Sequence, residues 1–125
     1  MPVLSETTHP GGFLVWEAFR DYTREVVTIA TGGANPILQP GTVLGKITAT
    51  GKYAAHDPAA TDGTETAVAV LWGKADATAA DVEAVALLRG PAIVNANDLV
   101  FAGTPTQLEI DAAHTALAAA GILVR

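Results

Sequence analysis

The chain has 125 residues, of which 50% are hydrophobic and 16% charged, and its formal net charge is −6. This length is typical of one domain with a sizeable core, and the absence of cysteine excludes disulfides, thiolate metal sites and cysteine nucleophiles. The negative charge argues against nucleic acid as a partner, because phosphate binding needs clustered basic residues, whereas the seven here are scattered from Arg20 to Arg125.

Met1–Gly12 is predicted to be a flexible N-terminal arm (1–12) ahead of a domain at 13–125. It carries Pro2, Pro10 and a glycine pair among small polar residues, and without a periodic apolar face it cannot offset the entropy cost of its own ordering. The arm lacks the basic start and apolar core of a signal peptide. No apolar run in the chain approaches the ~20 residues that span a bilayer. We therefore expect a soluble protein with no export signal and no membrane partner.

Three strands are predicted in the first part of the domain. Arg24–Ala30 is β-branched and is followed by glycines, and Ala34–Pro40 then indicates a loop. Val43–Thr48 and Ala67–Trp72 are apolar runs joined by a long polar connector that contains glycine and proline, a pattern typical of buried strands.

The strand predicted at Ala67–Trp72 is apolar on both faces. Its alternation places one set of side chains opposite another: Ala67, Ala69 and Leu71 against Val68, Val70 and Trp72. A strand of this kind is either sandwiched between layers or lies at a subunit contact.

Asp76–Gly90 is compatible with two structures. Its apolar residues have helical spacing, but the segment also fits a short strand that ends before Gly90-Pro91. Ala92–Val94 and Leu99–Phe101 are short apolar runs, and the intervening Asn95–Asp98 suits a turn.

Thr104–Ala120 carries the clearest helix signal in the chain. Thr104 is predicted as N-cap and Pro105 as the first helical residue, with Gln107 completing a capping box. An apolar stripe follows, formed by Ile110, Ala113, Leu117 and Ala120. Gly121 predicts the end of the helix, and Ile122–Val124 a closing strand.

Two motifs suggest ligand chemistry and fit it poorly. Gly45 and Gly51-Lys52 do not have the spacing of a phosphate loop, and a tyrosine follows the lysine where Ser or Thr is required. Asp57, Asp62 and Glu65 do not alternate as calcium ligands do in an EF-hand. A turn and an aspartate-capped surface loop are the preferred interpretations, and no metal is expected.

Catalytic residues are not expected either. His9, His56 and His114 lack metal-ligand spacing, which favours ordinary exposed histidines. Ser5 is the one serine and lies in the arm, and no spacing requires two carboxylates to pair as general acid and base. Trp16 and Trp72 are interpreted as core or interface anchors.

The chain resembles the lambda-like bacteriophage head decoration proteins, nearly end to end. The most specific segment is GTVLGKIT…GKY…DPAATDG within Gly41–Leu71. The other matching segments are HPGGFLVWEA (His9–Ala18), REVVTIATGG (Arg24–Gly33), DATAAD (Asp76–Asp81), RGPAIVN (Arg89–Asn95) and AAGILVR (Ala119–Arg125). The resemblance favours a strand within Asp76–Gly90.

The resemblance implies a small α+β domain that consists mainly of β-strands, is β-tulip-like and has one C-terminal helix. It implies no catalytic residue and no cofactor. It implies a homotrimer on the outside of the expanded phage head, at local threefold positions, that stabilises the head against internal DNA pressure. The arm would add a strand to the major capsid protein, and synthesis would occur in the host bacterial cytoplasm. The capsid-facing positions carried over are Pro2, Val3, Leu4, Ser5, Glu6, Thr7, Thr8, His9, Phe13, Leu14 and Val15.

Two other classes of function remain open from the residues alone. A β-rich binding module for a small molecule or surface glycan would need Trp16 or Trp72 exposed in a concave pocket beside polar groups. An acid–base hydrolase would need two carboxylates within reach of each other in one cleft.

Overall fold

A computed structural model of the protein describes residues 9–32 and 36–125. The elements in chain order are β1 (Leu14–Glu17), α1 (Arg20–Thr23), β2 (Arg24–Ile29), β3 (Ile37–Leu38), β4 (Val43–Lys46), β5 (Tyr53–Ala55), β6 (Ala67–Leu71), β7 (Ala75–Asp76), β8 (Val82–Leu87), β9 (Ala92–Val94), the 3-10 turn η1 (Ala96–Asp98), α2 (Gln107–Ala119) and β10 (Ile122–Val124). The predicted class, mainly β with one C-terminal helix, is confirmed.

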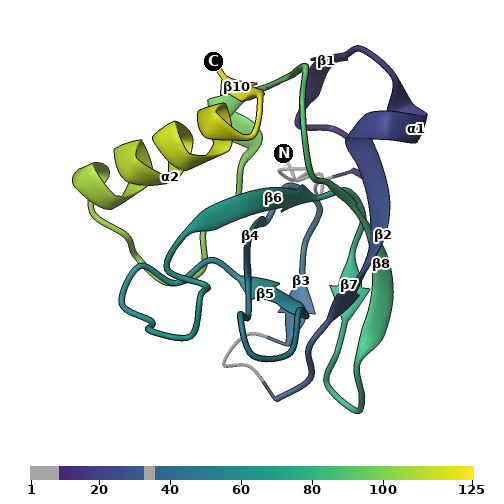
Figure 1. Ribbon diagram of the computed structural model, residues 1–125, viewed down its shortest axis with the longest axis vertical. Helices are drawn as coiled ribbons and strands as arrows, with labels where there is room; N and C mark the ends of the chain where they lie inside the picture. The colour runs from purple at the N-terminus through teal and green to yellow at the C-terminus, as the bar shows by residue number, and fades with distance from the viewer. Residues whose placement is uncertain (1–8, 33–35) are drawn as a thin grey trace, which may run out of the picture.

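The strands form a barrel with a second sheet at one end (Figure 1). Strands β2, β5, β4, β6 and β8 close the barrel in that order, and β1, β9 and β10 form the three-stranded end sheet. Strands β3 and β7 pair as a short ribbon, and α2 packs beside β6 and β10. The C-terminus lies at the end sheet (Figure 1).

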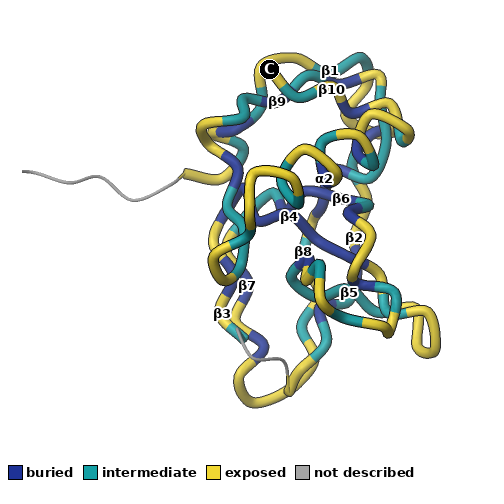
Figure 2. The backbone as a smooth tube through the Cα atoms, turned by 90° about the vertical axis from the view of Figure 1, so that its left-hand side faces the viewer, coloured by how far each residue is buried: buried dark blue, intermediate teal, exposed yellow. Residues whose placement is uncertain are grey.

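Strand β6 lies between two hydrophobic cores of the same chain, and it is buried along most of its length (Figure 2). Ala69 and Leu71 pack inside the barrel, whereas Ala67 and Val70 pack against the core under α2 that also contains Leu117. The layered interpretation of the doubly apolar strand is therefore correct. The predicted faces are wrong at Ala67 and Val68, because the pairing with β4 shifts register there. Ala67 packs on the side of Val70, and Val68 packs on the side of Ala69.

The segment Asp76–Gly90 contains a strand and no helix. β8 pairs with β2 along its whole length, with Val26 opposite Val85, and its last residues also pair with β6. Because these two neighbours take up the backbone donors and acceptors of β8, pairing overrides the helical propensity of its alanines.

Several short elements were not predicted. β5 lies inside the expected polar connector and β3 inside the expected loop, while α1 is a single turn between β1 and β2. Leu99–Phe101 forms an isolated bridge from Val100 to Thr42 rather than a strand. Each of these pieces is two to four residues long, too short to show a hydrophobic period.

Helix α2 begins two residues later than predicted. Thr106, not Thr104, is the N-cap: its side chain accepts a hydrogen bond from the Glu109 N–H, and the Glu109 carboxylate accepts one from the Thr106 N–H. Ala113 and Leu117 of the predicted stripe are buried. Gly121 follows the helix with φ 87°, the left-handed conformation that favours glycine at this position.

Replacing Thr106 with alanine should lower the free energy of unfolding by about 1 kcal/mol, because the Glu109 N–H loses the Thr106 hydroxyl as its hydrogen-bond partner. Urea denaturation followed by circular dichroism measures the change. Thr104→Ala is the matched control and should change stability by less than about 0.5 kcal/mol. Equal losses in the two variants would contradict the assignment of the cap.

Candidate functional site

The described chain begins at His9, at the base of the predicted arm; Pro2–Thr8 lie outside the described residues. The Gly11 N–H donates to the Trp72 carbonyl at 3.0 Å, and the Gly12 N–H donates to the His9 carbonyl at 3.0 Å. Gly11 has φ 68°, and a Cβ there would lie 2.3 Å from the Trp72 ring. Only glycine fits this contact, so the chain has a fixed position at residue 11.

Phe13 anchors this base inside the domain. Its side chain is 2% exposed and its ring meets the Trp72 ring edge-on at a centroid distance of 5.7 Å. The capsid contact expected at Phe13 stays a prediction, and in the isolated chain this side chain packs inside the domain. Leu14 is half-buried against the same core, whereas Val15 is 61% exposed. A capsid contact of Leu14 and Val15 stays a prediction.

Trp72 is partly buried against side chains of its own chain. The Arg24 guanidinium lies 3.5 Å above its ring, and Arg24 also makes an ion pair with Glu17, with Nε donating to Oε2 at 3.2 Å. The Thr23 hydroxyl donates to the same Glu17 oxygen at 2.7 Å. Of the two interpretations of Trp72, core anchor or interface anchor, the structure supports the first. The cluster also ties β1 to β2 across α1.

The loop at residues 57–66 is held by its own carboxylates. Asp57 Oδ1 accepts from the Ala59 N–H, and Glu65 Oε2 accepts from the Gly63 N–H at 2.8 Å. Asp62 Oδ1 accepts from the N–H and the hydroxyl of Thr64 at 3.1 and 2.6 Å. These bonds confirm the capped-loop interpretation. Across residues 9–32 and 36–125, His, Asp and Glu form no group of three suited to a metal.

The glycines that suggested a phosphate loop have packing roles. Gly45 is in β4, where a Cβ would lie 2.4 Å from the Cα of Thr64, so the strand and the loop approach more closely than any other residue allows. Gly51 has φ 73° in the turn before β5, and Lys52 beyond it forms an ion pair with Asp81.

His56 is buried rather than exposed, which corrects the expectation for this residue. It is 4% exposed, and its Nδ1 lies 2.9 Å from the Thr64 carbonyl. The Phe101 ring lies between the imidazoles of His56 and His114, at centroid distances of 6.4 and 6.2 Å. His114 Nε2 is also buried and has no hydrogen-bond partner in the described part of the chain. His9 is exposed.

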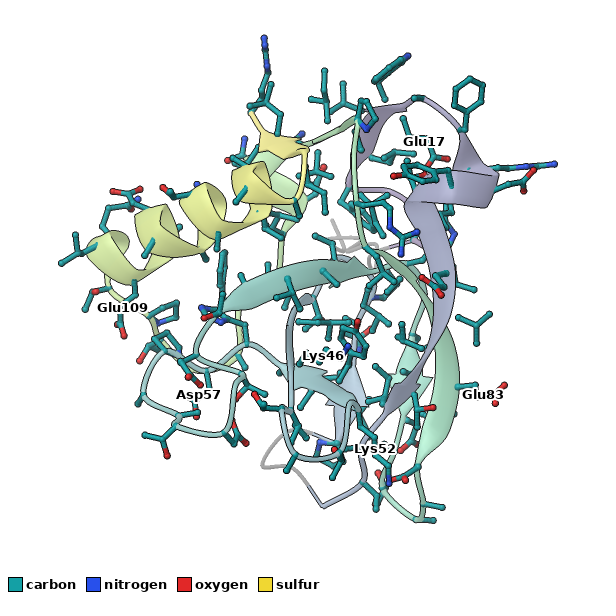
Figure 3. All side chains as sticks on the ribbon, in the orientation of Figure 1. Glu17, Lys46, Lys52, Asp57, Glu83 and Glu109 are labelled. Atoms are coloured by element: carbon teal, nitrogen blue, oxygen red, sulfur yellow. The ribbon has the colours of Figure 1, made fainter. Side chains whose placement is uncertain are left out.

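The carboxylates of the described chain are spread over several parts of the surface. Figure 3 shows Glu17, Glu83 and Glu109 on different sides of the molecule. Asp57 and Asp62 both line one hollow of the surface. Hydrogen bonds from Thr64 lower the pKa of Asp62. A general acid needs a raised pKa, so the shift at Asp62 runs in the wrong direction.

Asp81 ties three segments together at the far end of the barrel. Its carboxylate accepts from Lys52 Nζ, next to β5, and from the Thr31 N–H at 2.8 Å, just after β2. Two hydrogen bonds hold the pKa of Asp81 below its ordinary value of 3.8. The bond from Lys52 has the larger effect, and the bond from the Thr31 N–H adds to it.

This lowered pKa predicts a pH-dependent contribution to stability. Because the unfolded chain binds the proton more readily, the contribution is complete above pH 3.8 and is lost as the pH falls through the lower folded pKa. We expect Asp81→Asn to melt below the wild-type temperature at pH 6, with the difference shrinking below pH 3.8. Melting curves by circular dichroism between about pH 2.5 and 6 measure this. Lys52→Met should lower the melting temperature at pH 6 by part of the same amount. A melting difference between Asp81→Asn and the wild type that does not change with pH would contradict the prediction.

A family model described as bacteriophage lambda head decoration protein D matches residues 3–122 of the 125-residue chain. The chain belongs to this family. It is therefore a structural protein of the phage head decoration type rather than one of an enzyme family, and the family implies a location on the virion capsid. A search of curated proteins found no match.

A head decoration protein works through contacts with other proteins, so its exposed hydrophobic side chains are candidate contact residues. Its large hydrophobic side chains are unusually open around β1 and α1: Val15 61%, Trp16 51%, Phe19 73% and Tyr22 58% exposed. Sequence reasoning grouped Trp16 with Trp72, but only Trp16 remains open. Apolar side chains gathered on a surface mark contact sites. Over the described ranges, no helix has the length and hydropathy needed to cross a membrane.

Proposed function

We propose that this head decoration protein is a homotrimer that binds the outer surface of the expanded phage head at local threefold positions. It stabilises the head against internal DNA pressure, and its N-terminal arm adds a strand to the major capsid protein. The observation that carries the proposal is the base of the arm: Gly11 is held against Trp72 and Phe13 is buried, so the chain has a fixed position where the proposed arm joins the domain.

Strand addition suits an arm of this composition. Main-chain hydrogen bonds to an exposed sheet edge supply affinity, and alternate side chains supply specificity. Residues Pro2–Thr8 carry Val3 and Leu4 as apolar side chains among polar ones. Ordering the arm costs conformational entropy, so one arm binds weakly.

Three arms on one trimer offset that weakness. Once the first arm binds, the others act at an effective concentration in the millimolar range, and avidity exceeds single-site affinity by about 10²–10⁴. The fixed base at Gly11 keeps the three arms in a constant arrangement, which multivalent binding requires because the sites must be engaged at the same time. The absence of cysteine suits folding in the bacterial cytoplasm before assembly.

Electron microscopy of expanded heads mixed with the protein tests the proposal. We expect trimeric knobs at the local threefold positions and a density strand that joins each knob to a shell-protein sheet. Heads that stay bare at saturating protein, or single subunits bound away from the threefold positions, would overturn it.

The alternative of a glycan or small-molecule module has no supporting observation. It requires an exposed tryptophan in a hollow beside polar groups. Trp72 is covered by Phe13, Arg24 and Gly11, and Trp16 lies on the outer face of the end sheet.

A further inference from the structure

The end sheet is apolar on both faces. Ala92, Val94 and Ile122 are at most 2% exposed and face the core. The intervening residues face outward and form one row across the three strands, because Trp16 pairs with Ile93 and Ile93 pairs with Leu123. Trp16 is 51% and Leu123 41% exposed. Together with the exposed Phe19, which follows β1 in the chain, we call this row the outer sheet face.

A second apolar surface lies on the other side of α1. Val26 and Val85 face each other across β2 and β8 and are 58% and 38% exposed. They form part of a shallow hollow, which we call the β2–β8 hollow, lined by Arg20, Asp21, Arg24, Glu25, Val26 and Val85. Figure 1 shows α1 at the corner between the end sheet and the β2–β8 side of the barrel.

These two surfaces differ in shape and chemistry in a complementary way. The outer sheet face offers large side chains, with Phe19 73% exposed, so the hollow of its own chain does not cover this ring. The hollow combines the apolar side chains of Val26 and Val85 with Arg20, which suit an aromatic ring through burial and cation–π contact.

Charge also favours contact at these surfaces. The chain carries a net charge of −6, so two copies repel each other over most of their surface. The four residues of the outer sheet face are uncharged, and the hollow balances two arginines against two carboxylates. Contact between these two surfaces therefore brings no net charge from either copy into the interface.

We propose that the outer sheet face of one copy, led by Trp16 and Phe19, packs into the β2–β8 hollow of the next copy, and that this is the contact that closes the ring of three. The inference rests on the proposed homotrimer. A ring needs two different surfaces on every subunit, because a head-to-tail contact joins unlike patches, whereas one self-complementary patch gives a dimer.

Paired variants test the contact from both sides. Trp16→Ser/Phe19→Ser removes the inserted side chains, and Val26→Glu places a charge in the hollow. All three positions are more than half exposed, so the folded subunit is expected to persist, as circular dichroism melting checks. Sedimentation equilibrium should show the 12.7 kDa monomer for each variant at concentrations where the wild type is trimeric. Association should weaken at least about 30-fold, the loss typical of a removed aromatic hot spot.

Mixing the two variants gives the sharper result. One intact contact remains, between the unaltered outer sheet face of Val26→Glu and the unaltered hollow of Trp16→Ser/Phe19→Ser, so a one-to-one dimer should form. Leu108→Ser, which alters a side chain 79% exposed on α2, is the control and should stay trimeric. Mixed variants that remain monomeric would overturn the head-to-tail contact.

The outcomes separate this inference from the proposed function. If the variants remain trimeric and lose only their binding to heads, the outer sheet face contacts the shell, and the inference is wrong while the proposed function stands. Wild-type protein that is monomeric at high concentration would overturn both.

Discussion

Deleting residues 2–8 should abolish decoration of expanded heads and leave the domain folded. The deletion removes the segment proposed to add a strand to the shell protein, and it keeps Gly11 and Phe13, which hold the base of the arm on Trp72. Three arms are lost at once, so binding should fall by at least about 10²-fold, the lower end of the avidity that linked sites supply. Co-sedimentation with expanded heads measures it.

The point of truncation decides what this experiment reports. A deletion through Gly12 would also remove the Gly11 contact and uncover the Trp72 ring, so lost binding and lost stability would be mixed. Leu4→Pro in the full-length chain is a matched test, because proline removes one main-chain donor and keeps the arm length. A shortened protein that still decorates heads at full occupancy would contradict the arm mechanism and leave the family assignment intact.

Replacing Gly90 with alanine should destabilise the domain more than replacing Thr106 or Asp81. A Cβ at this position would lie 1.8 Å from the carbonyl oxygen of Gly121, where the turn after β8 meets the turn after α2. The obstacle is backbone, so no side chain can rotate away. We expect a loss of about 3 kcal/mol, the upper end of the usual cost of overpacking, and a fall in Tm of about 10 °C or more.

Gly73→Ala is the matched control for this substitution. A Cβ on Gly73 would meet no atom within 4 Å, and this residue has no positive φ. Its unfolding free energy should change by less than about 0.5 kcal/mol. Thermal melts of the two variants measure the contrast, and a Gly90→Ala protein that melts within about 2 °C of the control would contradict the close approach.

The sequence predicted best where a local signal was strong. Helix α2 was expected from its capping residues, its apolar stripe and Gly121, and the error at its start arose because two threonines compete for the N-cap. Each threonine has a Gln or Glu three residues later, and in the structure Thr106 and Glu109 make the reciprocal pair of hydrogen bonds. β2 was predicted for a similar reason, since β-branched residues followed by glycine mark a strand without help from a partner.

The sequence was least informative where partners distant in the chain decide the result. β8 became a strand because β2 and β6 lie on either side of it. His56 was expected on the surface, and it is buried because the loop at 57–66 folds back and places the Thr64 carbonyl beside its ring.

The sequence by itself determined the family, the class of fold, the C-terminal helix and the strands whose side chains carry a clear period. Tertiary structure alone decided that Phe13 is an internal anchor while Trp16 is open, and that Val26 and Val85 lie together beside two arginines. The physical reason is that periodicity and capping depend on neighbours within a few residues, whereas exposure depends on contacts between segments far apart in the chain. For a protein that works through its surface, those distant contacts determine where it binds.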